Sequence, residues 1–282
     1  MNMLLWSTDV SDASYVETFA MLGDAGYEGV EVPVFDPDPH KAEQTGERLR
    51  ELGLVPLGVT ARGEAQSPIS EDASVRRAAV EATRLEVEAC AAMGAALLCG
   101  PIAAPLGVFS GRGPTRAELA RSVESLRAMS EHAASHGVTL VVEYLNRFEL
   151  YLVNCAADAA ALVREVDHPN CRLMYDTFHA HIEEKSPRAA IEACADVLVH
   201  FHASENDRGT PGSGQVDWDG TFDALRAGGY DGWVVVEAFG DALAELAAAT
   251  KVWRRTFESE EQLARDGARF LRGHVAKIAA AR

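Results

Sequence analysis

Four polar side chains, each placed directly after a short apolar run, could together bind a metal ion. They are Glu143, Asp176, His202 and Glu237, and the runs before them are rich in Val, Leu, Met and Phe. A single carboxylate in such a place is usually a helix N-cap or a solvated charge, and a single His usually packs in the core. Four in succession indicate a shared ion, because carboxylates held close together repel one another unless a cation lies between them.

The ligand types in this set indicate which ion would suit it. Three carboxylates and one imidazole offer mainly oxygen, and no cysteine stands beside them. Oxygen-rich sites with one nitrogen favour Mn²⁺, Mg²⁺ or Co²⁺ over a structural zinc ion. We therefore expect one divalent ion per subunit, which could be Mn²⁺, Mg²⁺ or Co²⁺.

More polar residues follow the same runs and could bind a substrate. Arg147 and Glu149 come shortly after the first carboxylate, and His179 stands about one helical turn after the second. Residues 203–214, after the histidine, form a Gly- and Pro-rich segment that could be a substrate loop or a connection with turn chemistry only. Arg208 is the strong cation of that loop and could bind a substrate oxygen. Arg147 could equally form a structural ion pair.

The rest of the sequence contains the elements that would bring these residues together. A helix-like stretch repeatedly ends in Gly and is followed within a few residues by an apolar run, as at Gly137 before residues 138–142. Gly supplies the left-handed helix cap, and near-continuous apolar runs are typical of buried parallel strands. This pattern predicts eight strands, near residues 2–7, 28–33, 54–60, 95–100, 138–144, 171–176, 196–202 and 232–238.

Eight such units in 282 residues match a (β/α)8 TIM barrel, which typically needs about 250 residues. A doubly wound sheet is the alternative, but it would usually carry a Gly-rich phosphate loop after its first strand. No such loop follows residues 2–7. We therefore predict an α/β fold, a single (β/α)8 TIM barrel domain over residues 1–282. In such barrels the active site lies at the carboxyl ends of the strands, which is where the four candidate ligands stand.

One helix can be predicted in more detail. Thr115 and Glu118 have capping-box spacing directly after Pro114, so a helix should begin there. Apolar residues then follow at helical intervals and form one face, which comprises Leu119, Val123, Leu126, Met129 and Ala133. We interpret this stripe as core rather than as a binding surface.

Composition and charge exclude several classes of function. The chain has 43 acidic and 26 basic residues and a net charge of -17, which repels phosphate backbones and anionic membranes. No apolar run approaches the roughly 20 residues that span a bilayer, and the first residues lack the features of a signal peptide. We expect a cytoplasmic protein that binds a small molecule rather than nucleic acid or a membrane.

Four segments of the second half resemble elements of a known family. Residues 143–149 (EYLNRFE) resemble the EPxNRFE element of ketose 3-epimerases, the D-tagatose and D-psicose 3-epimerase group. Residues 176–184 (DTFHAHIEE) are similar to the DTFHMNIEE element of that family. Residues 202–214 resemble its HxHxxEnxRxxPGxG stretch, and residues 237–239 its EPF element. The wider group is the xylose isomerase-like TIM barrels.

This resemblance implies roles for individual residues. The metal ligands would be Glu143, Asp176, His202 and Glu237. Glu143 and Glu237 would also be the acid and base that exchange protons with the substrate. Glu149, His179 and Arg208 would hold the substrate around O1 and O2.

The implied reaction agrees with the chemistry of these residues. Inversion of a carbon next to a ketone requires a base to remove a proton on one face and an acid to return it on the other. A metal ion at the carbonyl stabilises the charge that develops. The resemblance thus implies a metal-dependent isomerase that inverts C3 of a free sugar, a ketose, through a cis-enediolate. We also expect a homodimer or homotetramer.

The sequence departs from the family pattern at several positions. Tyr144 and Ala238 stand where prolines are usual, and residues 215–218 replace a histidine-containing run. Residues 61–66 have no counterpart that can be placed. None of these positions is a metal ligand, and they bear on which sugar is bound.

Other activities use the same kind of barrel. A lyase, either a 3-keto-sugar or C-glycoside deglycosidase or an inosose dehydratase, would use the same metal-stabilised enolate and the same glutamates. It is the main alternative. Hydride-shift isomerases usually need a second metal ion, and abasic-site endonucleases need several zinc ions and a basic face. A sugar sensor without catalysis would not need both glutamates.

Overall fold

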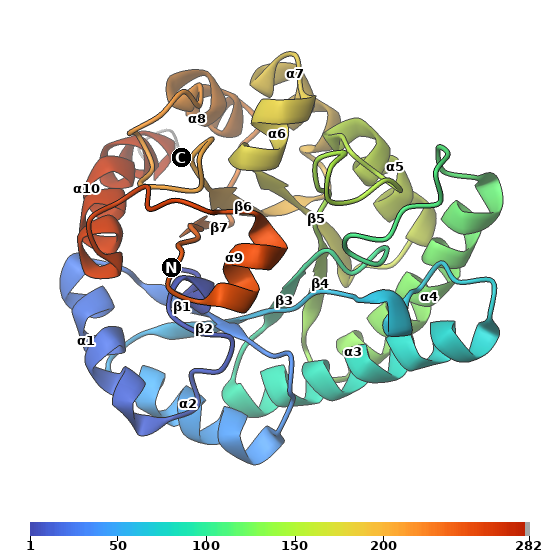
Figure 1. The fold of residues 1–282 in the computed structure, drawn as a ribbon, viewed down its shortest axis with the longest axis horizontal. Helices are drawn as coiled ribbons and strands as arrows, with labels where there is room; N and C mark the ends of the chain where they lie inside the picture. Colours follow the sequence, from blue (N-terminus) through green and yellow to red (C-terminus); the bar gives the residue numbers. More distant parts are fainter. Residues whose placement is uncertain (280–282) are drawn as a thin grey trace.

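The computed structural model describes residues 1–279 and shows a barrel of parallel strands surrounded by helices (Figure 1). Seven strands pair in sequence order, each parallel to its neighbours. Their bounds are β1 Gly29–Pro33, β2 Val55–Val59, β3 Leu97–Gly100, β4 Thr139–Val142, β5 Cys171–Asp176, β6 Leu198–Ala203 and β7 Trp233–Val236. They match seven of the eight predicted strands to within two residues at each end.

The eighth strand position is taken by the first two residues, and the predicted first strand is wrong beyond Asn2. The N–H of Asn2 donates to the carbonyl of Val236 in β7 (2.9 Å), and the N–H of Glu31 in β1 donates to the carbonyl of Met1 (2.9 Å). The chain then leaves the sheet as a 3₁₀ helix, Met3–Leu5. It does so because the Asn2 side chain accepts an N–H of that helix and caps it.

Helices complete the barrel. Their bounds are α1 Val16–Ala25, α2 Pro39–Glu51, α3 Ala73–Met93, α4 Arg116–Ser135, α5 Ala156–Val166, α6 Thr177–Glu183, α7 Pro187–Cys194, α8 Trp218–Ala227, α9 Ala244–Thr250 and α10 Glu260–Ala279. Within residues 1–279, eight of them (α1–α5, α7, α8 and α10) contact one another in a closed ring around the strands (Figure 1). The fold is therefore the predicted barrel of eight β/α units. In the same part of the chain, no helix is long and apolar enough to cross a membrane.

Helix α4 shows how the sequence sets the boundary of an element. The Thr115 hydroxyl accepts the N–H of Glu118 (3.2 Å), and the Glu118 carboxylate accepts the N–H of Thr115 (2.7 Å). The predicted capping box is thus confirmed. Val123, Leu126 and Met129 are buried, so the apolar stripe of this helix is core, as expected.

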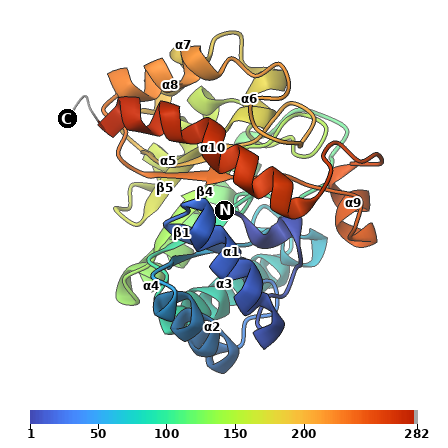
Figure 2. The same ribbon diagram turned by 90° about the vertical axis from the view of Figure 1, so that its left-hand side faces the viewer.

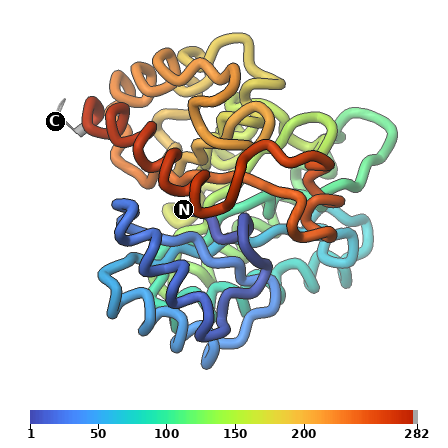
Figure 3. The backbone as a smooth tube through the Cα atoms, turned by 60° about the vertical axis from the view of Figure 1, so that its left-hand side comes forward, coloured from blue at the N-terminus to red at the C-terminus, as the bar shows by residue number. Residues whose placement is uncertain are grey.

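The carboxyl ends of the strands form one mouth of the barrel, and helix α9 lies across it (Figure 1). In the side view α9 projects at one edge, and α10 runs from there toward the opposite edge (Figure 2). The tube in Figure 3 shows the first helix close to the C-terminal one, in agreement with the contacts between α1 and α10. Apolar side chains such as Leu57, Cys99 and Val141 fill the barrel. The polar site therefore lies between this core and α9.

Candidate active site

The four candidate ligands converge at the mouth of the barrel. Glu143 directly follows β4, Asp176 ends β5, His202 lies near the end of β6, and Glu237 directly follows β7. One ligand atom from each lies within 4.8 Å of those of the others, and all four residues are buried. His202 Nδ1 lies 3.2 Å from Glu237 Oε1 and 3.6 Å from Asp176 Oδ2. The residues selected by their strand-end positions are therefore close enough to share one ion.

The imidazole of His202 shows that this group fits a cation. Its Nε2 lies 3.0 Å from a carboxylate oxygen of Glu31, whereas its buried Nδ1 has no hydrogen-bond partner among the described residues. Burial lowers the pKa of His202, but the negative charges of Glu31 and Glu237 outweigh burial and raise that pKa well above its usual value. A divalent ion would replace the proton at Nδ1 and neutralise the carboxylates that face it. This oxygen-rich set with one nitrogen suits Mn²⁺, Co²⁺ or Mg²⁺.

Asp176 uses its two oxygens differently. Its Oδ1 accepts the N–H groups of Phe178 (2.6 Å) and His179 (3.2 Å) and so caps helix α6. Its Oδ2 faces His202. The common explanation of a strand-end carboxylate, that it caps a helix, is correct here for one oxygen, and the other oxygen is directed at the site.

Arg208 reaches the site from the loop between β6 and α8. Its Nη1 donates to Glu237 Oε2 (2.6 Å) and to Ser204 Oγ (3.0 Å) and lies 3.5 Å from Asp176 Oδ2. Its guanidinium carbon lies 3.7 Å from the centre of the Phe178 ring, which is cation–π geometry. The backbone at Arg208 is left-handed, with φ 63°, which is uncommon for a residue other than Gly. The loop thus delivers a fixed cation to the carboxylates.

A further buried carboxylate holds this loop in place. Glu205 is fully buried. It accepts the backbone N–H groups of Gly212 (2.8 Å) and Gln215 (3.1 Å) and the indole N–H of Trp218 (3.1 Å). The segment 203–214 is therefore more than a connection with turn chemistry. The buried Glu205 side chain binds its backbone, and the segment places Arg208 at the site.

Glu143 and Glu237 differ in their affinity for a proton. Burial and then the negative charge of Glu237 raise the pKa of Glu143 well above its usual value. Burial also opposes ionisation of Glu237, but the positive charges of His202 and Arg208 outweigh it and lower the pKa of Glu237. Two carboxyl groups whose environments push their pKa values apart are typical of an acid and base pair.

The residues expected to hold a substrate surround the same point. His179 Nε2 lies 3.0 Å from Arg208 Nη2 and 3.7 Å from Glu143 Oε1, and its Nδ1 accepts the backbone N–H of Asn146 (3.1 Å). Burial and then the charge of Arg208 lower the pKa of His179 to about 3, so the ring is neutral. The Asn146 side chain donates to Glu149 Oε1 (2.8 Å). Asn146 therefore positions both His179 and Glu149.

Several of these side chains line a cavity of about 100 Å³ at the mouth of the barrel. Its polar wall consists of Glu143, Glu149, His179, Arg208 and Glu237. Its apolar wall includes Leu4, Phe35, Leu106 and Phe239, and α9 contributes Leu246, Ala249 and Thr250. The cavity is thus polar on the side of the candidate ligands and apolar under the helix that crosses the mouth.

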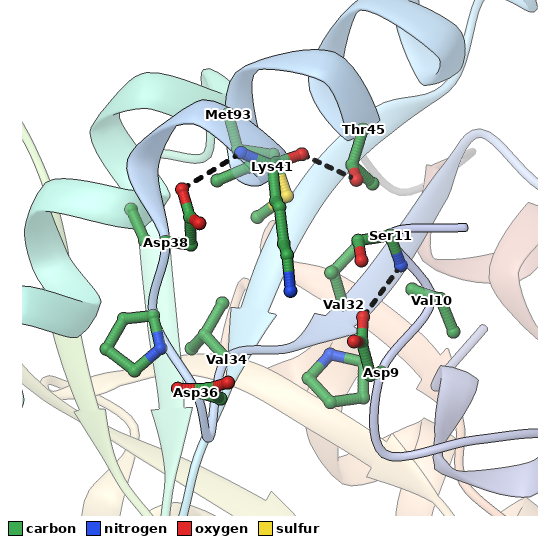
Figure 4. Close-up of a pocket in the computed structure, with 14 residues that line it drawn as sticks. Asp9, Val10, Ser11, Val32, Val34, Asp36, Asp38, Lys41, Thr45 and Met93 are labelled. Atoms are coloured by element: carbon green, nitrogen blue, oxygen red, sulfur yellow. Dashed lines mark hydrogen bonds between the residues drawn. The ribbon is translucent and has the colours of Figure 1, made fainter. Parts of the chain in front are cut away.

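Two other features lie outside this cavity. Arg147 forms an ion pair with Glu183 (2.7 Å) and is largely exposed, so of its two possible roles the structure shows the ion pair. A separate hollow beside β1 is lined by Asp9, Asp36 and Lys41, and the Lys41 side chain points into it (Figure 4). None of the candidate ligands or substrate residues lines that hollow.

Three buried polar residues beneath the site were not predicted from the sequence: Asn2, Glu31 and His200. A signal for two of them was present. Glu31 is a lone charge between Val30 and Val32 in a strand. His200 precedes His202 by two residues, and side chains two apart in a strand point to the same face.

Comparison with known proteins gives consistent matches. The sequence model described as xylose isomerase-like TIM barrel matches residues 19–274. A probable ketose 3-epimerase from a Synechocystis species is 33% identical over 250 residues, 88% of this chain and 86% of the relative. An L-ribulose 3-epimerase from a Methylomonas species is 30% identical over 274 residues, 95% of this chain and 94% of the relative. The crystal structure of a D-allulose 3-epimerase from Methylomonas in complex with D-allulose superimposes with a TM-score of 0.90 at 29% identity, covering 97% of this chain and 95% of the other.

Proposed function

Because this chain belongs to the xylose isomerase-like TIM barrel family, we propose that it is a metal-dependent ketose 3-epimerase that inverts C3 of a free ketose. Relatives named ketose and L-ribulose 3-epimerase, which match most of the chain, support this activity. The observation that carries the proposal is the placement of Glu143 and Glu237. These two buried carboxyl groups, with opposite pKa shifts, line one cavity and belong to one candidate metal centre.

The two glutamates divide the proton transfer between them. Glu237 would accept the C3 proton and Glu143 would donate one, an order that agrees with the directions of their pKa shifts in the metal-free chain. Return of the proton on the opposite face inverts the carbon. In the reverse direction the two residues exchange roles, because each then starts in the other protonation state.

The remaining polar residues bind and orient the sugar. The four ligands would hold one divalent ion, which when bound supplies electrostatic stabilisation of the charge developing on the ketose oxygens. The neutral His179 lies between Asn146, whose backbone N–H donates to its Nδ1, and Arg208, whose Nη2 lies 3.0 Å from its Nε2, and it is placed to contact a substrate oxygen. Arg208 and Glu149 complete the polar wall around O1 and O2. The apolar wall under α9 excludes water from the developing charge.

The proposal includes four finer points. Mn²⁺ is the ion that we expect, with Co²⁺ or Mg²⁺ as substitutes, since the ligands are oxygen-rich with one nitrogen. A homodimer or homotetramer would cover large apolar side chains such as Phe148 and Trp253, each 70% exposed. A cytoplasmic location agrees with five free cysteines. We also propose that residues 1–282 form one domain.

Incubation of the Mn²⁺-loaded protein with a panel of ketoses in D₂O tests the activity. The panel contains D-allulose, L-ribulose, D-fructose and D-tagatose, and NMR spectroscopy follows the products. Epimerisation should produce the C3 epimer with deuterium at C3. Absence of a C3 epimer and of deuterium at C3 from every ketose would overturn the proposal.

The same experiment separates the lyase alternative. The relatives described above are epimerases, and this does not favour a lyase. A lyase acting on a 3-keto-glycoside or an inosose would release an aglycone or water and leave an unsaturated product. Adding one substrate of each kind to the panel therefore distinguishes elimination from epimerisation by product mass.

A further inference from the structure

A group of buried polar residues lies directly beneath the candidate metal centre and is not part of it. Glu31 is the third residue of β1, and its side chain is fully buried in the barrel. His200 and Cys99 lie beside it, from β6 and β3. Cys99 Sγ donates to Glu31 Oε1 at 3.4 Å, a long contact. Three residues from separate parts of the chain thus meet around one carboxylate, since Asn2 also contacts it.

Glu31 accepts hydrogen bonds from three nitrogen donors. Its Oε1 lies 2.6 Å from His200 Nε2, and its Oε2 lies 3.0 Å from His202 Nε2 and 2.9 Å from Asn2 Nδ2. A carboxylate without a proton only accepts, so each histidine must carry its proton on Nε2. Glu31 is therefore the common acceptor that sets which ring nitrogen of each histidine is protonated.

This arrangement determines whether the ring nitrogen of His202 that faces the site carries a proton or a lone pair. With its proton held on Nε2 by Glu31, neutral His202 presents the lone pair of Nδ1 toward Asp176 and Glu237. A ligating histidine whose other ring nitrogen donates to a carboxylate is held in the correct orientation and becomes a stronger ligand. The ring of His202 is fully buried, so no solvent molecule can easily replace this partner.

Asn2 extends the support to a second ligand. Its Nδ2 donates to Glu31 Oε2 (2.9 Å) and to Glu237 Oε1 (3.1 Å). The same residue closes the barrel between β1 and β7 through its backbone. One hydrogen-bonded pair, Glu31 and Asn2, therefore orients two of the four candidate ligands from below.

We propose that Glu31 is a positioning residue of the metal centre, acting through the Nε2 proton of His202. The proposal rests on the proposed metal-dependent function. The cluster of Glu31, Cys99, His200 and His202 could itself be considered a second ion site. Because both oxygens of Glu31 already accept N–H groups at hydrogen-bonding distances, we assign it to hydrogen bonding and expect one ion per chain.

Titration calorimetry with Mn²⁺ on chelator-treated protein tests this role. Glu31→Gln keeps the shape of the side chain, but its amide offers one acceptor oxygen instead of two and adds N–H donors that face the existing donors. We expect Mn²⁺ affinity to fall about 10–100-fold, with one ion per chain in both proteins. Glu118→Gln is the matched control, because Glu118 is a buried carboxylate of the α4 capping box, and Gln also serves there. Its Mn²⁺ affinity should equal that of the wild type.

A second readout separates positioning from a purely structural role. If Glu31 acts through metal binding, saturating Mn²⁺ should restore most of the kcat of Glu31→Gln. Should that variant fail to fold, His200→Leu removes the shortest hydrogen bond to Glu31 and leaves the Glu31–His202 bond in place. It should weaken Mn²⁺ binding several-fold.

Three results would overturn the inference. The first is unchanged Mn²⁺ affinity in the folded Glu31 variant, or in His200→Leu where the Glu31 variant does not fold. The others are a kcat that stays low at all Mn²⁺ concentrations and two ions per wild-type chain. Failure of the wild type to bind any divalent ion would instead overturn the proposed function.

Discussion

Arg208 Nη1 lies 2.6 Å from Glu237 Oε2, so a residue expected to bind the substrate also contacts one of the two acid/base groups. The guanidinium lies over the Phe178 ring, and both charged side chains are buried. Because water does not screen these charges, they attract each other more strongly than the charges of a surface ion pair, although each loses its hydration on burial. It helps to keep Glu237 ionised and hence able to accept a proton.

Removal of this cation should change the pH dependence of the reaction. The charge of Arg208 helps to lower the pKa of Glu237, so Arg208→Ala should raise that pKa. Since the base must be ionised, the acidic limb of the kcat/KM profile should move to higher pH. KM should rise at least as much as kcat falls, because a contact to the substrate is also lost.

A matched arginine provides the control for this prediction. Arg147→Ala removes a largely exposed ion pair with Glu183, and such pairs contribute about 0–1 kcal/mol to stability. Its kinetics should resemble those of the wild type. An acidic limb that stays in place in Arg208→Ala would show that Arg208 does not influence the base.

The two glutamates can be tested separately. Glu143→Gln and Glu237→Gln keep a ligating oxygen but remove the carboxylate base, so each should reduce turnover by roughly 10²–10⁴-fold and change substrate affinity far less. In D₂O a single variant could still exchange the C3 proton on one face without completing the epimerisation. Near wild-type turnover in both variants would exclude the two-glutamate mechanism.

Removal of the metal should abolish turnover. We expect activity to disappear on chelation and to return with Mn²⁺ or Co²⁺. His202→Ala should weaken metal binding sharply, because it removes the one nitrogen ligand of the set. Elemental analysis of the chelated protein, together with its activity, checks the prediction, and full activity without metal would contradict it.

The sequence predicted the candidate ligands better than the residues that support them. Glu143 and Glu237 directly follow strands, and strand ends in a barrel share one rim, so local pattern was enough to group them. Glu31 lies in the middle of β1 and Asn2 lies before the first helix. Glu31 contacts His202, 171 residues away, and Asn2 contacts Glu237, 235 residues away. A local sequence pattern does not indicate contacts between residues so far apart.

The prediction of the first strand was wrong beyond Asn2 for a local reason. Residues 2–7 are apolar enough for a buried strand, but the side chain of Asn2 caps a 3₁₀ helix and turns the chain out of the sheet. A short polar side chain that bonds to the backbone nearby competes with sheet formation. Arg208 was predicted as a residue of the site, but its contact with Glu237 was not, because that contact depends on a left-handed backbone and on Glu205, which binds the loop backbone from inside.

His179 should make the metal-free protein sensitive to acid. Its pKa is about 3 in the folded chain and about 6.5 when unfolded. Above pH 6.5 the residue is neutral in both states and adds no pH dependence. Between these values the unfolded chain binds a proton that the folded chain does not, so stability falls as pH decreases.

The variant His179→Asn isolates this effect, because Asn does not titrate in this range. At pH 7 the variant should be less stable than the wild type, since it loses contacts to Asn146 and Arg208. Below about pH 6 this difference should shrink by roughly 1 kcal/mol for each pH unit, because only the wild type has a histidine here to protonate. Urea unfolding of both chelated proteins between pH 7 and pH 4.5 measures the difference. A gap that stays constant over this range would mean that His179 is protonated in the folded protein, and it would remove the neutral imidazole from the proposed mechanism.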